Sequence, residues 1–85
     1  MLFKKDKPSL GSVVYELTVN NTITEWVVSE ISKDKRGTCQ YMLSREDGRS
    51  FYVCEEKDLG KSVFSDYKEA FKEKERRMYE TRRKA

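Results

Sequence analysis

Apolar and polar residues alternate along much of the first two thirds of this chain, a pattern typical of half-buried β-strands. From residue 13 to residue 19, Val13, Tyr15, Leu17 and Val19 share one face and Val14 lies on the other. Similar alternation recurs twice more before residue 55. The pattern predicts strands at about residues 13–19, 22–31, 38–44 and 50–54, with a possible short fifth strand at 61–64.

Turn residues separate these segments. Asn20-Asn21 tolerates the left-handed backbone of a tight hairpin, and Asp47-Gly48 is a strong hairpin signal between two strand patterns. The segment 22–31 holds the only tryptophan, Trp26, and its apolar residues break strict alternation. A bulge or a strong twist in a long strand explains such a break.

A helical pattern follows at about residues 66–82. Ser65 is the expected N-cap, and Asp66 and Glu69 suit the positive end of the helix dipole. The apolar stripe is thin and Lys74 interrupts it, so the helix is expected to dock by its first two turns and to project beyond them. The stripe consists of Tyr67, Ala70, Phe71 and Met78.

Consecutive short strands followed by one helix predict an α+β fold that is mainly β. We expect a four- to five-stranded antiparallel meander, bent into an SH3-like barrel, with one C-terminal helix. A flat sheet with the helix across one face is the alternative. Residues 1–11 lack periodicity and are expected to form a flexible leader, with residues 12–85 as a single domain.

The composition fits one small intracellular domain. The chain has 85 residues, of which 36% are hydrophobic and ten are aromatic (one Trp, five Tyr, four Phe). No apolar run approaches the ~20 residues of a membrane span, and no apolar segment follows the basic start. Two cysteines are too few for a disulfide scaffold, so Cys39 and Cys54 are expected to be buried in a cytoplasmic protein.

The sequence offers no set of catalytic residues. It contains no histidine, which removes the commonest general base and metal ligand. Gly60-Lys61-Ser62 resembles the end of a phosphate-binding loop, but Glu55 stands where the first glycine would be. The acidic residues Glu55, Glu56 and Asp58 are expected to be solvated. We therefore predict no enzyme activity, no cofactor, no metal site and no small-molecule substrate.

The positive charge lies in the last segment. Residues 66–85 carry eight basic and five acidic residues, which accounts for the whole net charge of +3, whereas residues 1–65 carry ten of each. A basic helix is one candidate surface for phosphate contacts. Glu73 is spaced for helical ion pairs with Arg76 and Arg77. The residues of this nucleic-acid alternative are Arg76, Arg77, Arg82, Arg83 and Lys84. Any of Trp26, Tyr41, Phe51 and Tyr52 that proves exposed is a candidate for base stacking.

A protein-interaction module is the favoured hypothesis, with a protein partner or a second copy of the chain bound at a sheet edge, a groove or the projecting helix. Phe71, Met78 and Tyr79 lie on neighbouring helical faces and are the candidates for self-association. Phe71 packing on its own barrel is the competing interpretation. Met78 distinguishes the two interpretations. It lies too far along the helix to reach a small barrel, so its burial in a second chain would favour self-association.

One segment also resembles a known group of proteins. Asp58-Leu59-Gly60-Lys61-Ser62-Val63-Phe64, followed by Ser65 and Glu69-Ala70, is similar to a strand-to-helix motif of small proteins encoded by prophages and mobile elements of Gram-positive gut bacteria. The resemblance spans residues 13–71 and departs from the group at Lys68 and in the charged C-terminus. It implies a phage or mobile-element origin and no particular activity.

Overall fold

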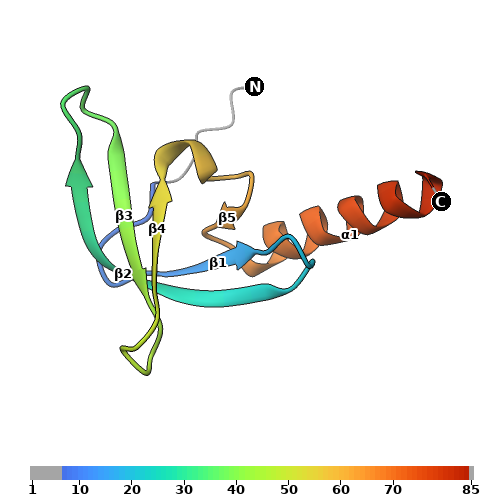
Figure 1. Cartoon of the computed structure of the whole chain (residues 1–85), viewed down its shortest axis with the longest axis horizontal. Coiled ribbons are helices and arrows are strands. Elements are labelled where there is room, and N and C mark those ends of the chain that lie inside the picture. The colour runs from blue at the N-terminus through green and yellow to red at the C-terminus, as the bar shows by residue number, and fades with distance from the viewer. Residues whose placement is uncertain (1–6, 85) are drawn as a thin grey trace.

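The predicted α+β fold is confirmed. The computed structural model describes residues 7–84, with side chains for residues 7–80. Antiparallel strands are followed by a single long helix at the C-terminal end (Figure 1). The elements are β1 (Val13–Leu17), β2 (Ile23–Lys33), β3 (Cys39–Ser44), β4 (Phe51–Glu55), the short 3₁₀ turn η1 (Glu56–Asp58), β5 (Val63–Phe64) and α1 (Tyr67–Lys84).

The five strands form one sheet in the order β4-β3-β2-β1-β5. The sheet curls into a half-barrel, and α1 lies against its outer face beside β1 and β5 (Figure 1). This is an SH3-like arrangement, as predicted, in which the two terminal strands β4 and β5 are not paired with each other. The barrel therefore keeps an open edge along β4.

The irregular pattern of the second strand has the predicted cause. The pairing of β2 with β3 shifts between Val28 and Glu30, so Ser29 is an extra residue in an 11-residue strand. The Ser29 Oγ donates a hydrogen bond to the Met42 carbonyl oxygen at 3.0 Å. Such a bulge bends and twists a strand. It lets the two halves of β2 belong to differently oriented parts of the sheet (Figure 1).

The main core fills the inner face of the half-barrel. Tyr41 and Leu43 are each 1% exposed, and Trp26 is 8% exposed. The Trp26 Nε1 donates a hydrogen bond to Glu16 Oε1 at 3.0 Å, which satisfies the one polar atom of the indole. The buried members of this cluster are Val14, Trp26, Val28, Cys39, Tyr41, Leu43, Cys54, Leu59 and Val63.

A second, smaller cluster holds the helix on the outer face. Leu17, Phe64 and Ala70 are buried together, and the Tyr67 ring meets the Tyr15 ring edge-on at 5.5 Å. Ala70 is fully buried between α1 and the sheet, in the cluster with Leu17 and Phe64. As predicted, α1 docks by its first turns and then extends past the end of β1 (Figure 1).

The predicted division of the first strand into one buried and one exposed face is wrong. Val14 is fully buried in the inner core, Leu17 is buried in the outer cluster, and Val13 is 39% exposed. Val19 lies outside the strand in the β1–β2 turn and is 96% exposed. The physical reason is that β1 is covered on both faces, by the inner core and by α1, so simple alternation does not apply.

The helix and its N-cap each begin one position later than expected. Asp66 immediately precedes α1, and its Oδ1 accepts a hydrogen bond from the Lys68 backbone N–H at 3.1 Å. The cap is therefore Asp66, whereas Ser65 was expected. The predicted hairpin turn at Asn20-Asn21 is present, and Asn21 has a positive φ of 61°.

The described end of the predicted leader is bonded to the domain. The Gly11 N–H donates to the Val28 carbonyl oxygen at 2.8 Å, and the Val28 N–H donates to the Ser12 carbonyl oxygen at 2.9 Å. Lys7 forms an ion pair with Glu56 at 3.0 Å. Residues 1–6 of the predicted leader lie outside the described residues.

Candidate interaction surface

Beyond the helix, the outer face of the sheet carries a group of apolar side chains that no described element covers. The strand pairing places Val13 beside Val27, Val27 beside Ser44, and Ser44 beside Phe51, which makes one row across four strands. The next row runs from Glu30 to Met42 and Val53. We call the five apolar members of these rows the outer-face patch: Val13, Val27, Met42, Phe51 and Val53.

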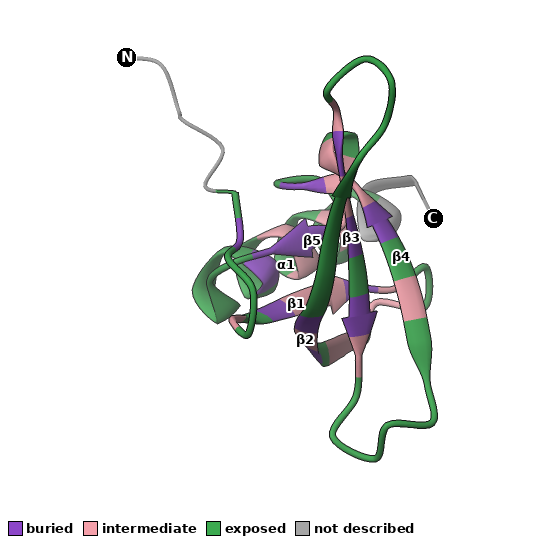
Figure 2. Cartoon of the chain, turned by 90° about the vertical axis from the view of Figure 1, so that its left-hand side faces the viewer, coloured by how far each residue is buried: buried purple, intermediate pink, exposed green. Residues whose placement is uncertain are grey.

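The patch is substantially open to solvent. Phe51 is 62% exposed and Val53 is 55% exposed, on the strand at the edge of the sheet (Figure 2). Val13 and Met42 are each more than a third exposed. Two shallow hollows adjoin the patch, one of about 290 Å³ beside Val13 and Val27 and one of about 120 Å³ beside Met42 and Val53. The surface is therefore uneven and has room for side chains of a bound polypeptide.

The edge of β4 also presents unpaired backbone groups. The Arg45 N–H donates to the Ser50 carbonyl oxygen at 3.3 Å across the β3–β4 turn. Because bonded pairs alternate along an antiparallel ladder, Tyr52 and Cys54 bond to β3, while the N–H and C=O groups of Phe51 and Val53 point away from it. No other described strand pairs with this side of β4.

The ladder along this open edge ends at Glu55. The Glu55 N–H donates a hydrogen bond to Asp58 Oδ2 at 3.0 Å. The Glu55 N–H, which is the next backbone donor after Val53 to point away from β3, is therefore already bonded to Asp58. An added strand therefore meets free groups only at Phe51 and Val53 along β4.

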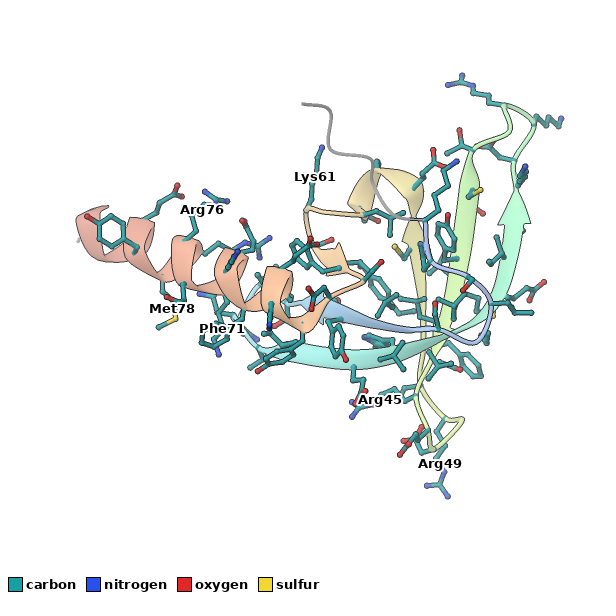
Figure 3. The ribbon with its side chains drawn as sticks, turned by 180° about the vertical axis from the view of Figure 1, so that it is seen from behind. Arg45, Arg49, Lys61, Phe71, Arg76 and Met78 are labelled. Atoms are coloured by element: carbon teal, nitrogen blue, oxygen red, sulfur yellow. The ribbon has the colours of Figure 1, made fainter. Side chains whose placement is uncertain are left out.

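The three helix residues predicted for self-association do not form one patch. Phe71 stacks with Tyr67 at 6.3 Å between ring centroids and remains 42% exposed. Phe71 and Met78 lie on the same side of α1 (Figure 3). Tyr79 is 65% exposed and lies about 100° around the helix from Met78. Their role in self-association stays a prediction.

The described basic residues of the helix are held by carboxylates. Arg76 donates hydrogen bonds to both carboxylate oxygens of Glu73 and, through Nη1, to Glu80 Oε1 at 2.7 Å. Arg77 donates through Nε to Glu73 and through Nη2 to the Lys61 carbonyl oxygen at 2.9 Å. The hydrogen bond from Arg76 lowers the pKa of Glu73, so that carboxylate stays ionised beside both guanidinium groups.

The remaining candidates of the nucleic-acid alternative lie outside the described side chains. These are Arg82, Arg83 and Lys84. Of the aromatic candidates for base stacking, Trp26 and Tyr41 are buried and Tyr52 is half-buried against Trp26, with ring centroids 5.9 Å apart. Phe51 alone of the four is exposed, so these aromatics do not form a stacking surface.

The acidic residues at the end of β4 and in η1 serve local structure. Asp58 accepts the bond from the Glu55 N–H, Glu56 pairs with Lys7, and Glu55 pairs with Lys57 at 3.2 Å. Among the described residues no group of three or more His, Cys, Asp or Glu side chains is arranged to hold a metal ion.

In the turn that resembles a phosphate-binding loop, the backbone N–H groups are already bonded to nearby backbone carbonyl oxygens. The Gly60 N–H donates to the Val63 carbonyl oxygen at 2.8 Å, and the N–H groups of Lys61 and Ser62 both donate to the Asp58 carbonyl oxygen. A phosphate loop needs such N–H groups to be free and convergent. This turn instead shapes the entry into β5, where Val63 is buried.

Both cysteines are free and buried, as the sequence predicted. Cys54 is 0% exposed, and burial raises the pKa of its thiol to about 12. A buried thiol that stays protonated is a poor nucleophile. Cys54 therefore contributes to packing in the inner core.

In comparisons with known proteins, no family model, no curated protein and no solved structure matches this chain. No helix in the part of the chain that the structure describes is long and apolar enough to cross a membrane. The resemblance to prophage-encoded proteins stays a prediction.

Part of the outer-face patch was predictable from the sequence. Alternation puts Phe51 and Val53 on one face of their strand, opposite Tyr52 and Cys54, but does not show that this face is exposed. Val13, Val27 and Met42 were not predicted as surface residues. The signal for Met42 is its position between the inward residues of β3, whereas the position of Val27 depends on the register with β1 and β3.

Proposed function

We propose that this chain is a non-enzymatic binding module that holds another polypeptide on its outer-face patch. The observation that carries the proposal is the set of adjacent apolar side chains, four exposed and Val27 half-buried, on the part of the sheet face that α1 leaves uncovered. Single exposed apolar residues are normal, but contiguous groups mark interaction surfaces.

The open edge of β4 supports the same proposal. Edge strands expose a row of backbone donors and acceptors, and soluble domains usually block them with charges, proline or a covering element. Phe51 and Val53 instead carry apolar side chains on this edge. An extended segment that adds to a sheet edge gains backbone hydrogen bonds there and gains specificity from pockets for alternate side chains. The hollow beside Met42 and Val53 is suited to receive a side chain of such a segment.

The helix is less suited to a binding role than the sheet. Arg76 and Arg77 are already engaged with carboxylates, which opposes counterion release at a nucleic-acid backbone. The proposal also includes a cytoplasmic location, supported by the two free cysteines. A phage or mobile-element origin is part of the same proposal and is supported only by the segment from Asp58 to Phe64.

The test is a selection of random peptides displayed on phage against the immobilised full chain, followed by affinity measurements on the selected peptides. Val13→Thr and Met42→Thr remove apolar surface from the patch and keep β-forming residues. Each is expected to weaken binding about fivefold or more, which corresponds to ~1 kcal/mol.

Val19→Thr is the matched control, because Val19 is 96% exposed in the β1–β2 turn and lies outside the patch. It should leave the affinity unchanged. Selected peptides that respond equally to Val13→Thr and Val19→Thr would refute the patch as the binding surface. A selection that yields no specific peptide would refute the proposed function.

A further inference from the structure

The geometry points to a second copy of this chain as the occupant of the β4 edge. In this dimer, two β4 strands pair antiparallel about a two-fold axis, with Tyr52 opposite Tyr52 of the second copy. The inference rests on the proposed function, because it names one polypeptide that the exposed edge is built to hold. A symmetric pairing of this kind needs a strand that is complementary to itself.

The backbone of β4 meets this requirement. In the register centred on Tyr52, Phe51 lies opposite Val53 of the second copy, and Val53 lies opposite Phe51. These are the two residues whose N–H and C=O groups point away from β3. The pairing therefore forms about four hydrogen bonds between the chains, and every outward group between the β3–β4 turn and Glu55 is used.

The side chains are also complementary in this register. Phe51 and Val53 of both copies meet on the outer face, as an aromatic residue beside a β-branched one, which is a favourable cross-strand pair. Arg49 lies in the β3–β4 turn, two residues before β4. Continuing the register past the strand places Arg49 opposite Glu55 of the second copy, a carboxylate that also pairs with Lys57 within each chain, and the symmetry repeats this arrangement at the other end. Each end of the apolar cluster is thus closed by opposite charges.

The neighbouring register is less favourable. If Val53 lay opposite Val53 of the second copy, Phe51 would face Glu55 and an apolar ring would meet a carboxylate. That register would also need the Glu55 N–H as a hydrogen-bond donor between the chains, and this N–H already donates to Asp58. The position of Asp58 therefore favours the register centred on Tyr52, in which the ladder stops where the free donors stop.

Dimerisation would enlarge the proposed binding surface. The outer-face patches of the two copies become continuous through Phe51 and Val53, while Val13 and Met42 remain available on each side. The half-barrels would join into one sheet across the two-fold axis. In the dimer the second copy is the extended segment that adds to the β4 edge, and a further partner polypeptide would bind across the sheet face.

The test measures the molar mass of the full chain by sedimentation equilibrium over a concentration series. We expect a monomer–dimer equilibrium. Arg49→Glu places like charges opposite each other at both ends and should raise the dissociation constant about tenfold or more. The double variant Arg49→Glu with Glu55→Arg restores opposite charges and should bring the dissociation constant back to within about threefold of the original.

Arg36→Glu is the matched control, since Arg36 is exposed in the β2–β3 turn and has no place in the β4–β4 pairing, so it should leave the dissociation constant unchanged. Amide hydrogen exchange gives an independent measurement: the Phe51 and Val53 amides should become protected as the concentration rises. Circular dichroism of each variant confirms that the fold is retained. Rescue by the double variant distinguishes charge pairing from damage to the fold.

A chain that is still monomeric at about 1 mM would overturn the inference. A dimer that is insensitive to Arg49→Glu, or that is not restored by the double variant, would overturn the register. If the chain is monomeric but binds selected peptides at the outer-face patch, the proposed function stands and the dimer fails. If the chain forms a dimer that responds to charge reversal but binds no peptide, the dimer stands and the proposed function fails.

Discussion

The attachment of α1 to the sheet depends on a small cluster, and Leu17→Ala tests it directly. Leu17 is 2% exposed and is buried with Phe64 and Ala70 on the outer face of β1. Half-buried Tyr15 and Ile23 complete the cluster. Few other apolar side chains connect the helix to the domain, so the loss of one buried leucine should lower the free energy of unfolding substantially.

The expected magnitude follows from the burial of the site. Replacing a buried leucine by alanine costs about 2–5 kcal/mol, with the larger values where the surroundings cannot relax. Here the half-exposed neighbours can partly fill the space, so we expect ~2–3 kcal/mol. The total stability of a domain of this length is of the order of 4–13 kcal/mol. The substitution should therefore remove a large part of it.

Urea unfolding is the assay, with two probes that report on opposite faces of the sheet. Trp26 fluorescence follows the inner core, and far-ultraviolet circular dichroism follows α1. With a urea dependence of roughly 1–2 kcal/mol per molar, the midpoint should fall by about 1–3 M. Both probes should shift together, since β1 is shared by both clusters and couples them.

Leu10→Ala is the matched control, because it makes the same chemical change at a residue that is 66% exposed. Its effect should stay within about 0.5 kcal/mol. If Leu17→Ala changed stability no more than Leu10→Ala, the outer cluster would not hold the helix. A helix signal lost well before the fluorescence change would refute the coupling through β1.

Three further predictions concern pH, backbone strain and nucleic acid. Burial raises the pKa of Cys54 from 9.0 to about 12, so between these values the unfolded chain loses a proton that the folded chain keeps. Stability should therefore fall with rising pH in that window, by up to ~1.4 kcal/mol per pH unit, and Cys54→Ala should reduce the slope in alkaline urea titrations. Gly60 has a φ of +80° with open space around it, so Gly60→Ala should cost about 1–2 kcal/mol from backbone strain alone, seen as a lower melting temperature; an unchanged value would contradict this. Fluorescence anisotropy with labelled DNA and RNA at ~50 mM salt should show the same affinity for the full chain and for Arg76→Gln, because Arg76 is already paired with Glu73 and Glu80; micromolar binding that Arg76→Gln weakens and that falls with rising salt would support the nucleic-acid alternative.

Local sequence signals determined most of the secondary structure of this protein. Asp47-Gly48 and Asn20-Asn21 set two hairpin turns, since both pairs accommodate the positive φ that such turns require. Alternation placed Cys39, Tyr41 and Leu43 on one buried face of β3. These features depend on neighbouring residues alone, so the sequence suffices to predict them.

The sequence also contains no histidine, which removes the commonest general base and metal ligand, and it determined the position of the charged helix. It placed Glu73 within reach of Arg76 and Arg77, and the structure shows both pairs. Helical spacing is a local property, which is why these pairs were predictable.

Only the tertiary structure decided which apolar residues are buried. Val13 and Val14 are equivalent in hydrophobicity, yet Val14 is fully buried and Val13 is exposed, because the register with β2 and the position of α1 choose between the two faces. The outer-face patch arises in the same way: residues distant in sequence come together through strand pairing, and α1 covers one end of the face and leaves the other open. The open edge of β4 likewise depends on where the sheet stops curling. Strand pairing and helix docking are long-range choices, and a single sequence contains no local signal for them.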